Sequence, residues 1–213
     1  LGKQLSLCRP RLDLRWTNIS VPFDSWEYSS LMFSKKDKRF YLPVPGSNYL
    51  CSWDLNFKKD SNPKFHELVL HDLPHMHRPR WKQFDSYSRE DHWVESPSGE
   101  CFLVKWYTEY KHTDGFVVPT VMVFREEDRK DGRINMRYTE DLGDNGIFIS
   151  KAEDFCVATS SNRGLWPNSI FSNGRLWATL DLTNKVTGCY EYPESTPDKI
   201  PYSPYWLTPF SST

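Results

Sequence analysis

Hydrophobic and polar positions alternate along this chain in short runs that turn-forming residues separate closely. Most runs span roughly four to ten residues and are rich in aromatic and β-branched side chains, which favours strands. No run is long enough for a convincing helix, so the pattern predicts an all-β fold. The predicted strands are residues 30–34, 39–44, 49–55, 65–70, 92–95, 101–108, 116–125, 133–138, 146–149, 155–158, 169–172, 175–182 and 186–192.

Tight turns connect several of these predicted strands. Residues 96–99 (SPSG) place Pro and Gly at the second and fourth positions that a type I turn favours. Asn173 and Gly174 lie between two apolar runs, and both residue types tolerate a positive φ angle. Short connections of this kind predict hairpins, and hence sheets built from strands that are adjacent in the sequence.

The strand pattern repeats approximately in three units, near residues 30–70, 92–138 and 146–192. Each unit has about 40–47 residues and about four strands, which is the size of one propeller blade. We therefore predict a β-propeller over residues 1–192. Because closed propellers have roughly four to eight blades, about three four-stranded blades predict a partial one. A proline-rich tail is expected over residues 193–213.

Charge and cysteine content narrow the classes of partner. The chain has 27 basic and 28 acidic residues, so no broad positive field is expected to attract nucleic acid. The sequence has neither a polybasic tail nor an apolar stretch of about 18 residues, so no membrane partner is expected. The five cysteines are far apart and form no Cys-x-x-Cys pair, which favours reduced thiols and a cytoplasmic or nuclear location.

One segment has the residue types of a metal site. His71, His75 and His77 lie close together, and Asp72 adds a carboxylate. Imidazoles two positions apart on an extended segment point the same way, as zinc ligands need to do. Prolines and polar residues around them are more typical of a loop, so we predict no metal and no cofactor. Without a nucleophile elbow or a phosphate loop in the sequence, we also predict that the chain is not an enzyme.

Aromatic residues beside arginines mark a candidate partner-binding surface. The predicted connection over residues 72–91 is longer than an ordinary hairpin loop, which favours a functional role. Trp81 follows Arg78 and Arg80 in this connection, and Trp166 lies in another loop. Rigid aromatic rings beside arginine are typical anchors of protein interfaces. We predict that these four side chains contact a protein partner.

Several motifs resemble the plant F-box/kelch-type propeller family, also described as KIB-type and as a domain of unknown function. The order and spacing of the motifs match across nearly the whole chain. They are residues 15–19 (RWTNI), 37–41 (DKRFY), 94–100 (VESPSGE), 102–104 (FLV), 138–144 (YTEDLGD), 147–149 (IFI), 155–157 (FCV) and 167–171 (PNSIF).

This resemblance implies a β-propeller that follows an N-terminal F-box. Such proteins are thought to be substrate receptors of SCF-type ubiquitin ligases, in which the F-box binds a Skp1-like adaptor and the propeller presents a protein target. The residues before Trp16 are too few to form an F-box. Adaptor binding is therefore expected only if an F-box lies upstream.

The leading hypothesis is a protein-interaction module that resembles the target-recognition propeller of an F-box protein. A first alternative is a metal-dependent enzyme that uses His71, His75 and His77. A second is a truncated paralogue without activity. A partial propeller would also expose strand edges, which invite aggregation or pairing with another chain.

Overall fold

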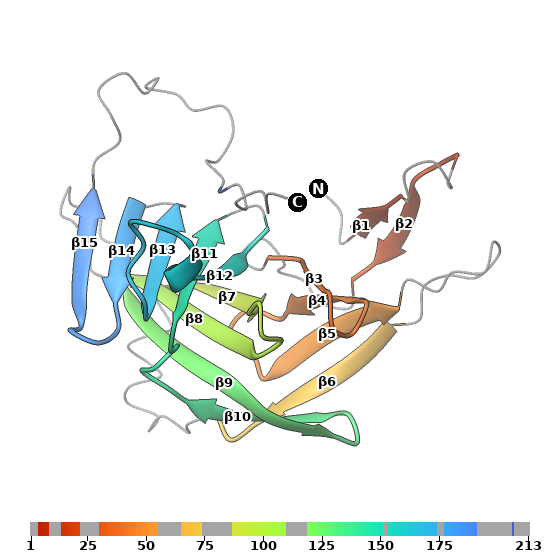
Figure 1. Ribbon diagram of the computed structural model, residues 1–213. Coiled ribbons are helices and arrows are strands. Elements are labelled where there is room, and N and C mark those ends of the chain that lie inside the picture. The colour runs from red at the N-terminus through yellow and green to blue at the C-terminus, as the bar shows by residue number, and fades with distance from the viewer. Residues whose placement is uncertain are drawn as a thin grey trace.

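The computed structural model describes residues 4–8, 14–21, 30–54, 65–73, 87–109, 119–150, 153–173, 177–190 and 206. Apart from one 3₁₀ turn, Thr159–Ser161, all regular structure in these ranges is β-strand (Figure 1). The strands are β1 Gln4–Leu7, β2 Thr17–Ser20, β3 Met32–Ser34, β4 Arg39–Pro43, β5 Tyr49–Asp54, β6 Phe65–His71, β7 Tyr87–Glu95, β8 Cys101–Glu109, β9 Thr120–Lys130, β10 Arg133–Tyr138, β11 Asn145–Ser150, β12 Phe155–Ala158, β13 Ser169–Asn173, β14 Trp177–Asp181 and β15 Val186–Tyr190.

These strands confirm the all-β prediction and the three repeating units. Strands β3–β6 form the first unit, β7–β10 the second and β11–β15 the third. The first two are antiparallel meanders that join into one eight-stranded sheet, because β6 and β10 pair in parallel through a short ladder that begins with Val69 and Arg133. Figure 1 shows this curved sheet below and the third unit beside it.

The third unit is a separate sheet of five strands, which match the five runs predicted between residues 146 and 192 and exceed the four strands of a typical blade by one. Its order is β12-β11-β13-β14-β15, with β11 and β13 parallel and the other pairs antiparallel. The predicted strand at residues 155–158 is β12, which pairs with the edge of β11 that β13 leaves free.

A small hairpin of β1 and β2 adds to the first unit. Ile19 of β2 and the following Val21 pack into a core cluster with Leu42, Cys51 and Trp53.

Cys8, Cys51, Cys101 and Cys156 are free thiols. No helix in the described residues is long and apolar enough to span a membrane.

The second unit is packed between the other two, and the two-residue period of its strands makes this possible. On one face of this sheet, Trp93 of β7 and Leu103 of β8 lie in a core cluster with Tyr41 and Leu50 of the first unit. On the other face, the next residues along each strand, Val94 and Val104, lie in a cluster with residues of the third unit such as Ile147 and Ile170. Both faces are therefore apolar, as packed blades require.

Strand β7 is longer than its sequence pattern predicted. The prediction placed a strand at residues 92–95 and a loop up to Asp91, whereas β7 begins at Tyr87. Residues 87–91 are mostly polar or charged, which is unusual for a strand that packs on both faces. The structure accommodates the buried charge of Asp91 because Lys105 of the neighbouring strand β8 pairs with it.

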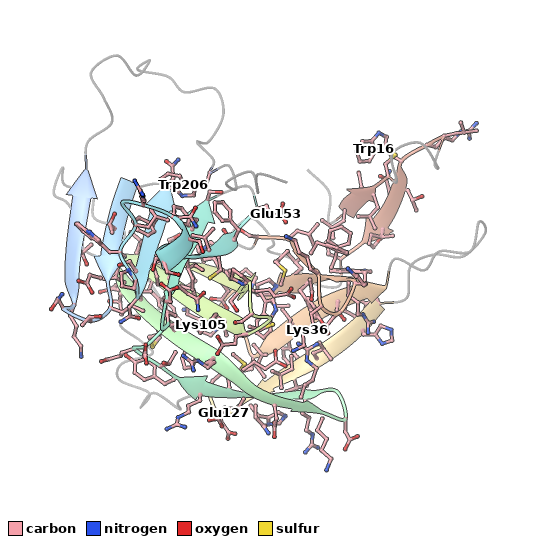
Figure 2. The ribbon with its side chains drawn as sticks, viewed as in Figure 1. Trp16, Lys36, Lys105, Glu127, Glu153 and Trp206 are labelled. Atoms are coloured by element: carbon pink, nitrogen blue, oxygen red, sulfur yellow. The ribbon has the colours of Figure 1, made fainter. Side chains whose placement is uncertain are left out.

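Asp91 is the first of these buried charges, and it faces the first unit. Its Oδ2 atom accepts hydrogen bonds from Lys105 Nζ at 2.7 Å and from the Gly46 backbone N–H at 3.2 Å. The same ammonium group donates to the Ser47 carbonyl oxygen at 3.0 Å. Lys105, labelled in Figure 2, is buried together with Asp91. The pair fastens the turn between β4 and β5 to the middle sheet.

Gly46 is required at this contact for two reasons. Its φ angle is +68°, which glycine adopts at little cost. In addition, a Cβ atom there would lie 3.0 Å from Cδ of Arg89, which packs over the turn. A side chain at residue 46 would therefore be strained in its backbone conformation and would require the Arg89 side chain to shift.

We expect the change Lys105→Met to destabilise the protein by about 3–5 kcal/mol, because it leaves the Asp91 carboxylate buried without its cation. Chemical denaturation measures this free energy of unfolding. The double change Asp91→Leu with Lys105→Met should cost less than Lys105→Met alone, and Lys130→Met at an exposed lysine is the control. A Lys105→Met protein as stable as the control would contradict this account.

Candidate functional site

The predicted partner-binding residues divide between described and undescribed parts of the chain. Arg78, Arg80 and Trp81 lie outside the described residues, so their role stays a prediction. Trp166 lies in the connection between the 3₁₀ turn and β13, and it is 62% exposed. An indole so exposed is available to a partner, and its predicted role also stays a prediction.

The predicted histidine cluster is only partly described. His71 is the last residue of β6, whereas His75 and His77 lie outside the described residues. In the ranges that the structure describes, no three His, Cys, Asp or Glu side chains come together as metal ligands would. The prediction that the chain binds no metal is therefore untested at the two imidazoles that matter most.

A groove of about 240 Å³ lies where the second and third units meet. Its apolar lining comes from Val121 and Val123 of β9 and from Leu180 and Leu182 at the end of β14. Val123 and Leu180 also belong to the core cluster between these units, and Val121 and Leu182 pack against it. The groove is thus the place where this core reaches the surface.

Tyr138 forms the polar and aromatic rim of the groove. Its ring is 48% exposed and contacts the ring of Phe124 edge-on, with 5.9 Å between centroids. Its hydroxyl donates to Glu140 Oε1 at 2.9 Å, and Lys185 Nζ lies 3.0 Å from the same oxygen. The bond from Lys185, followed by that from Tyr138, lowers the pKa of the Glu140 carboxyl. These contacts fix the orientation of an exposed ring, which reduces the entropy lost when a partner binds it.

Asn168 holds the two sides of the groove together. Its Nδ2 atom donates to the Glu140 carbonyl oxygen at 3.0 Å and to Thr183 Oγ1 at 2.8 Å, and its Oδ1 accepts from the Leu142 N–H at 2.7 Å. The φ angle of Asn168 is +55°, a conformation in which asparagine is enriched. One amide therefore links the loop after β10 to the turn after β14, and the groove is formed before any partner binds.

Ser30, His92 and Asp154 contain the residue types of a catalytic triad, but their geometry differs from one. Asp154 Oδ2 lies 2.8 Å from Nδ1 of His92, and Ser30 Oγ lies 3.4 Å from the same nitrogen. A triad places the serine on the opposite ring nitrogen, so that the imidazole can take its proton. All three residues are buried. This cluster is a structural ion pair between β7 and the segment before β12.

A comparison with protein families shows to which family the chain belongs. The model of the family described as KIB1-4 beta-propeller matches residues 2–193. The chain belongs to this family.

Membership in the KIB1-4 beta-propeller family confirms both the predicted resemblance and the predicted propeller fold. It also indicates a protein-interaction module, which is how β-propellers of this kind typically act. The chain matches no curated protein and no solved structure. The predicted boundary of the propeller at residue 192 stays a prediction.

The sequence did not predict the groove of this KIB1-4 propeller, although two residues that shape the groove lie in motifs that it identified. Tyr138 and Asn168 both lie in the motifs that carried the resemblance, 138–144 and 167–171. Their spacing gave no indication that the two motifs meet. An available signal was Tyr138 itself, an aromatic residue at the polar end of a strand.

His92 makes the stability of the fold depend on pH. Burial lowers the pKa of an imidazole, but the charge of Asp154 and its hydrogen bond, assisted by Glu90, raise the pKa of His92 to about 10. His92 is therefore protonated at neutral pH. Its stabilising effect is complete below the unfolded value of about 6.5 and is lost as the pH rises through about 10.

We expect the difference in unfolding free energy between the wild type and His92→Gln to decrease between pH 7 and pH 10, at about 1.4 kcal/mol for each pH unit. Denaturation of both proteins across this range measures the difference. Buried thiols whose pKa is raised to about 12, such as Cys101, also destabilise the fold at high pH, but they are common to both proteins. A difference that stays constant across the range would show that His92 is neutral in the folded state.

Proposed function

We propose that this chain is the target-recognition propeller of an F-box-type substrate receptor in an SCF-type ubiquitin ligase. It would hold a protein target by non-covalent contacts alone, in the cytoplasm or the nucleus. The F-box and its contact with a Skp1-like adaptor would lie outside these residues. The observation that carries the proposal is the preformed groove between the second and third units, with an oriented aromatic ring at its rim.

An extended segment of the target fits this site best. Strand β15 is at the edge of its sheet and pairs only with β14 among the described strands. Thr187 of β15 also lines the groove. A target segment that adds to this edge would gain backbone hydrogen bonds, while its alternate side chains enter the apolar groove between Val121 and Leu182.

The rim supplies the contact that we expect to dominate affinity. Tyrosine is enriched among the few interface residues that carry most of the binding energy. Tyr138 combines an exposed ring with a fixed hydroxyl. Lys185 and Glu140 neutralise each other beside it, which leaves the ring as the main feature for recognition.

We expect Tyr138→Ala to weaken target binding at least about 30-fold, the effect of losing roughly 2 kcal/mol at a dominant contact. Biolayer interferometry with a target identified by crosslinking to the groove measures this affinity. The matched control is Tyr49→Ala, since Tyr49 is similarly exposed at 44% but lies on β5 in the first unit. Equal affinities of the two variants would place the target elsewhere on the propeller.

The link to a ubiquitin ligase is tested separately. When the chain is expressed without an F-box, it should compete with the intact receptor and lengthen the half-life of the target. The Tyr138→Ala variant should not do so. A target half-life that the bound chain leaves unchanged would exclude the ligase role and leave the binding role intact.

A further inference from the structure

Three stacked phenylalanine rings cross the outer face of the third sheet, which is the face turned away from the second unit. Phe148 of β11 is paired in register with Phe155 of β12 on one side and with Phe171 of β13 on the other. The ring centroids lie 4.9 Å and 4.6 Å apart, with interplanar angles of 9° and 15°. The neighbours Ile147 and Ile149 belong to the core cluster on the opposite face. We call this row of rings the aromatic face.

Gly146 makes room for the aromatic face. It precedes Phe148 by two residues on β11, so a side chain at residue 146 would point to the same side of the sheet. A Cβ atom at Gly146 would lie 3.3 Å from the Phe171 ring and 3.3 Å from the methyl group of Thr159. The absence of a side chain therefore lets the Phe171 ring lie flat beside Phe148.

One distant residue of the chain occupies this face. The ring of Trp206 meets Phe148 edge-on, with 5.3 Å between centroids and an interplanar angle of 80°. Its indole N–H donates to the Ile149 carbonyl oxygen at 3.1 Å. The ladder between β11 and β12 ends at Phe148, so Ile149 lies just beyond it. Figure 2 labels Trp206 beside the third sheet. The site thus satisfies both the apolar ring and the polar N–H of an indole.

The burial of Trp206 differs from that of a core tryptophan. Trp53 and Trp93 are fully buried in the sheet packing, whereas Trp206 is only half-buried. It packs on the aromatic face, opposite the core cluster that contains Ile147 and Ile149. An indole held in this way can leave its site without opening the core.

We propose that the aromatic face, together with the Ile149 carbonyl, is a tryptophan-binding site whose resident ligand is Trp206 of the same chain. When Trp206 leaves, the site accepts a tryptophan-bearing segment of another protein. A tethered ligand has an effective concentration in the millimolar range, so an external segment competes poorly until the tether is released. This site is separate from the groove, because it is built from β11, β12 and β13.

The test uses the full chain with Trp206→Ala and a fluorescent peptide of residues 202–210. Fluorescence anisotropy should show saturable binding to this variant, and the apparent affinity for the wild type should be at least tenfold weaker. A peptide that carries Trp206→Ala should bind neither protein. No binding to the variant, or equal binding to both proteins, would overturn the proposal.

A second variant separates loss of the site from loss of the fold. Phe155 is half-buried at the end of the row, so Phe155→Leu in the Trp206→Ala chain should leave the thermal unfolding temperature nearly unchanged. It should also weaken peptide binding at least tenfold. The control is Phe65→Leu on β6, a partly exposed ring in the first unit. Peptide binding that is equal in the two variants would show that the aromatic face does not hold the indole.

Discussion

Two adjacent residues of opposite charge on β7, Asp91 and His92, hold the three units together. Because successive side chains of a strand point to opposite faces, Asp91 reaches Lys105 and the first unit, and His92 reaches Asp154 and the third. The apolar clusters on each side follow the same alternation through Trp93 and Val94. The middle sheet can therefore pack on both faces only if this register of β7 is kept.

The buried charges of Asp91 and His92 also disfavour other registers of β7. A shift of β7 by one residue in one direction would place the His92 imidazolium beside the Lys105 ammonium, and a shift in the other direction would place Asp91 beside the Asp154 carboxylate. Either shift would bring like charges together inside the protein. Apolar residues alone would make a slipped register less costly, since Trp93 and Val94 are both suited to a core. The buried charges of Asp91 and His92 thus distinguish the native register of β7 from registers that the apolar residues alone would tolerate.

The parts of the fold that were predicted from the sequence are those that depend on neighbouring residues. Period-two runs and turns such as Asn173-Gly174 predicted the strands and the three units, because each hairpin is local. The start of β7 was missed because residues 87–91 have the composition of a loop, and only partners far away in the chain make them a strand. The groove and the aromatic face were missed for the same reason, since Val121 meets Leu182, and Phe148 meets Phe171, only after the sheets have formed.

The parallel ladder between β6 and β10 has a consequence for how the protein folds. Every other pairing in the eight-stranded sheet joins strands that follow each other in the sequence, whereas Val69 and Arg133 are separated by β7, β8 and β9. Closing a long loop costs entropy before any contact compensates for it, so local pairings form first and distant ones later. The two meanders are therefore expected to form as independent halves, with the β6–β10 ladder as the last and slowest step.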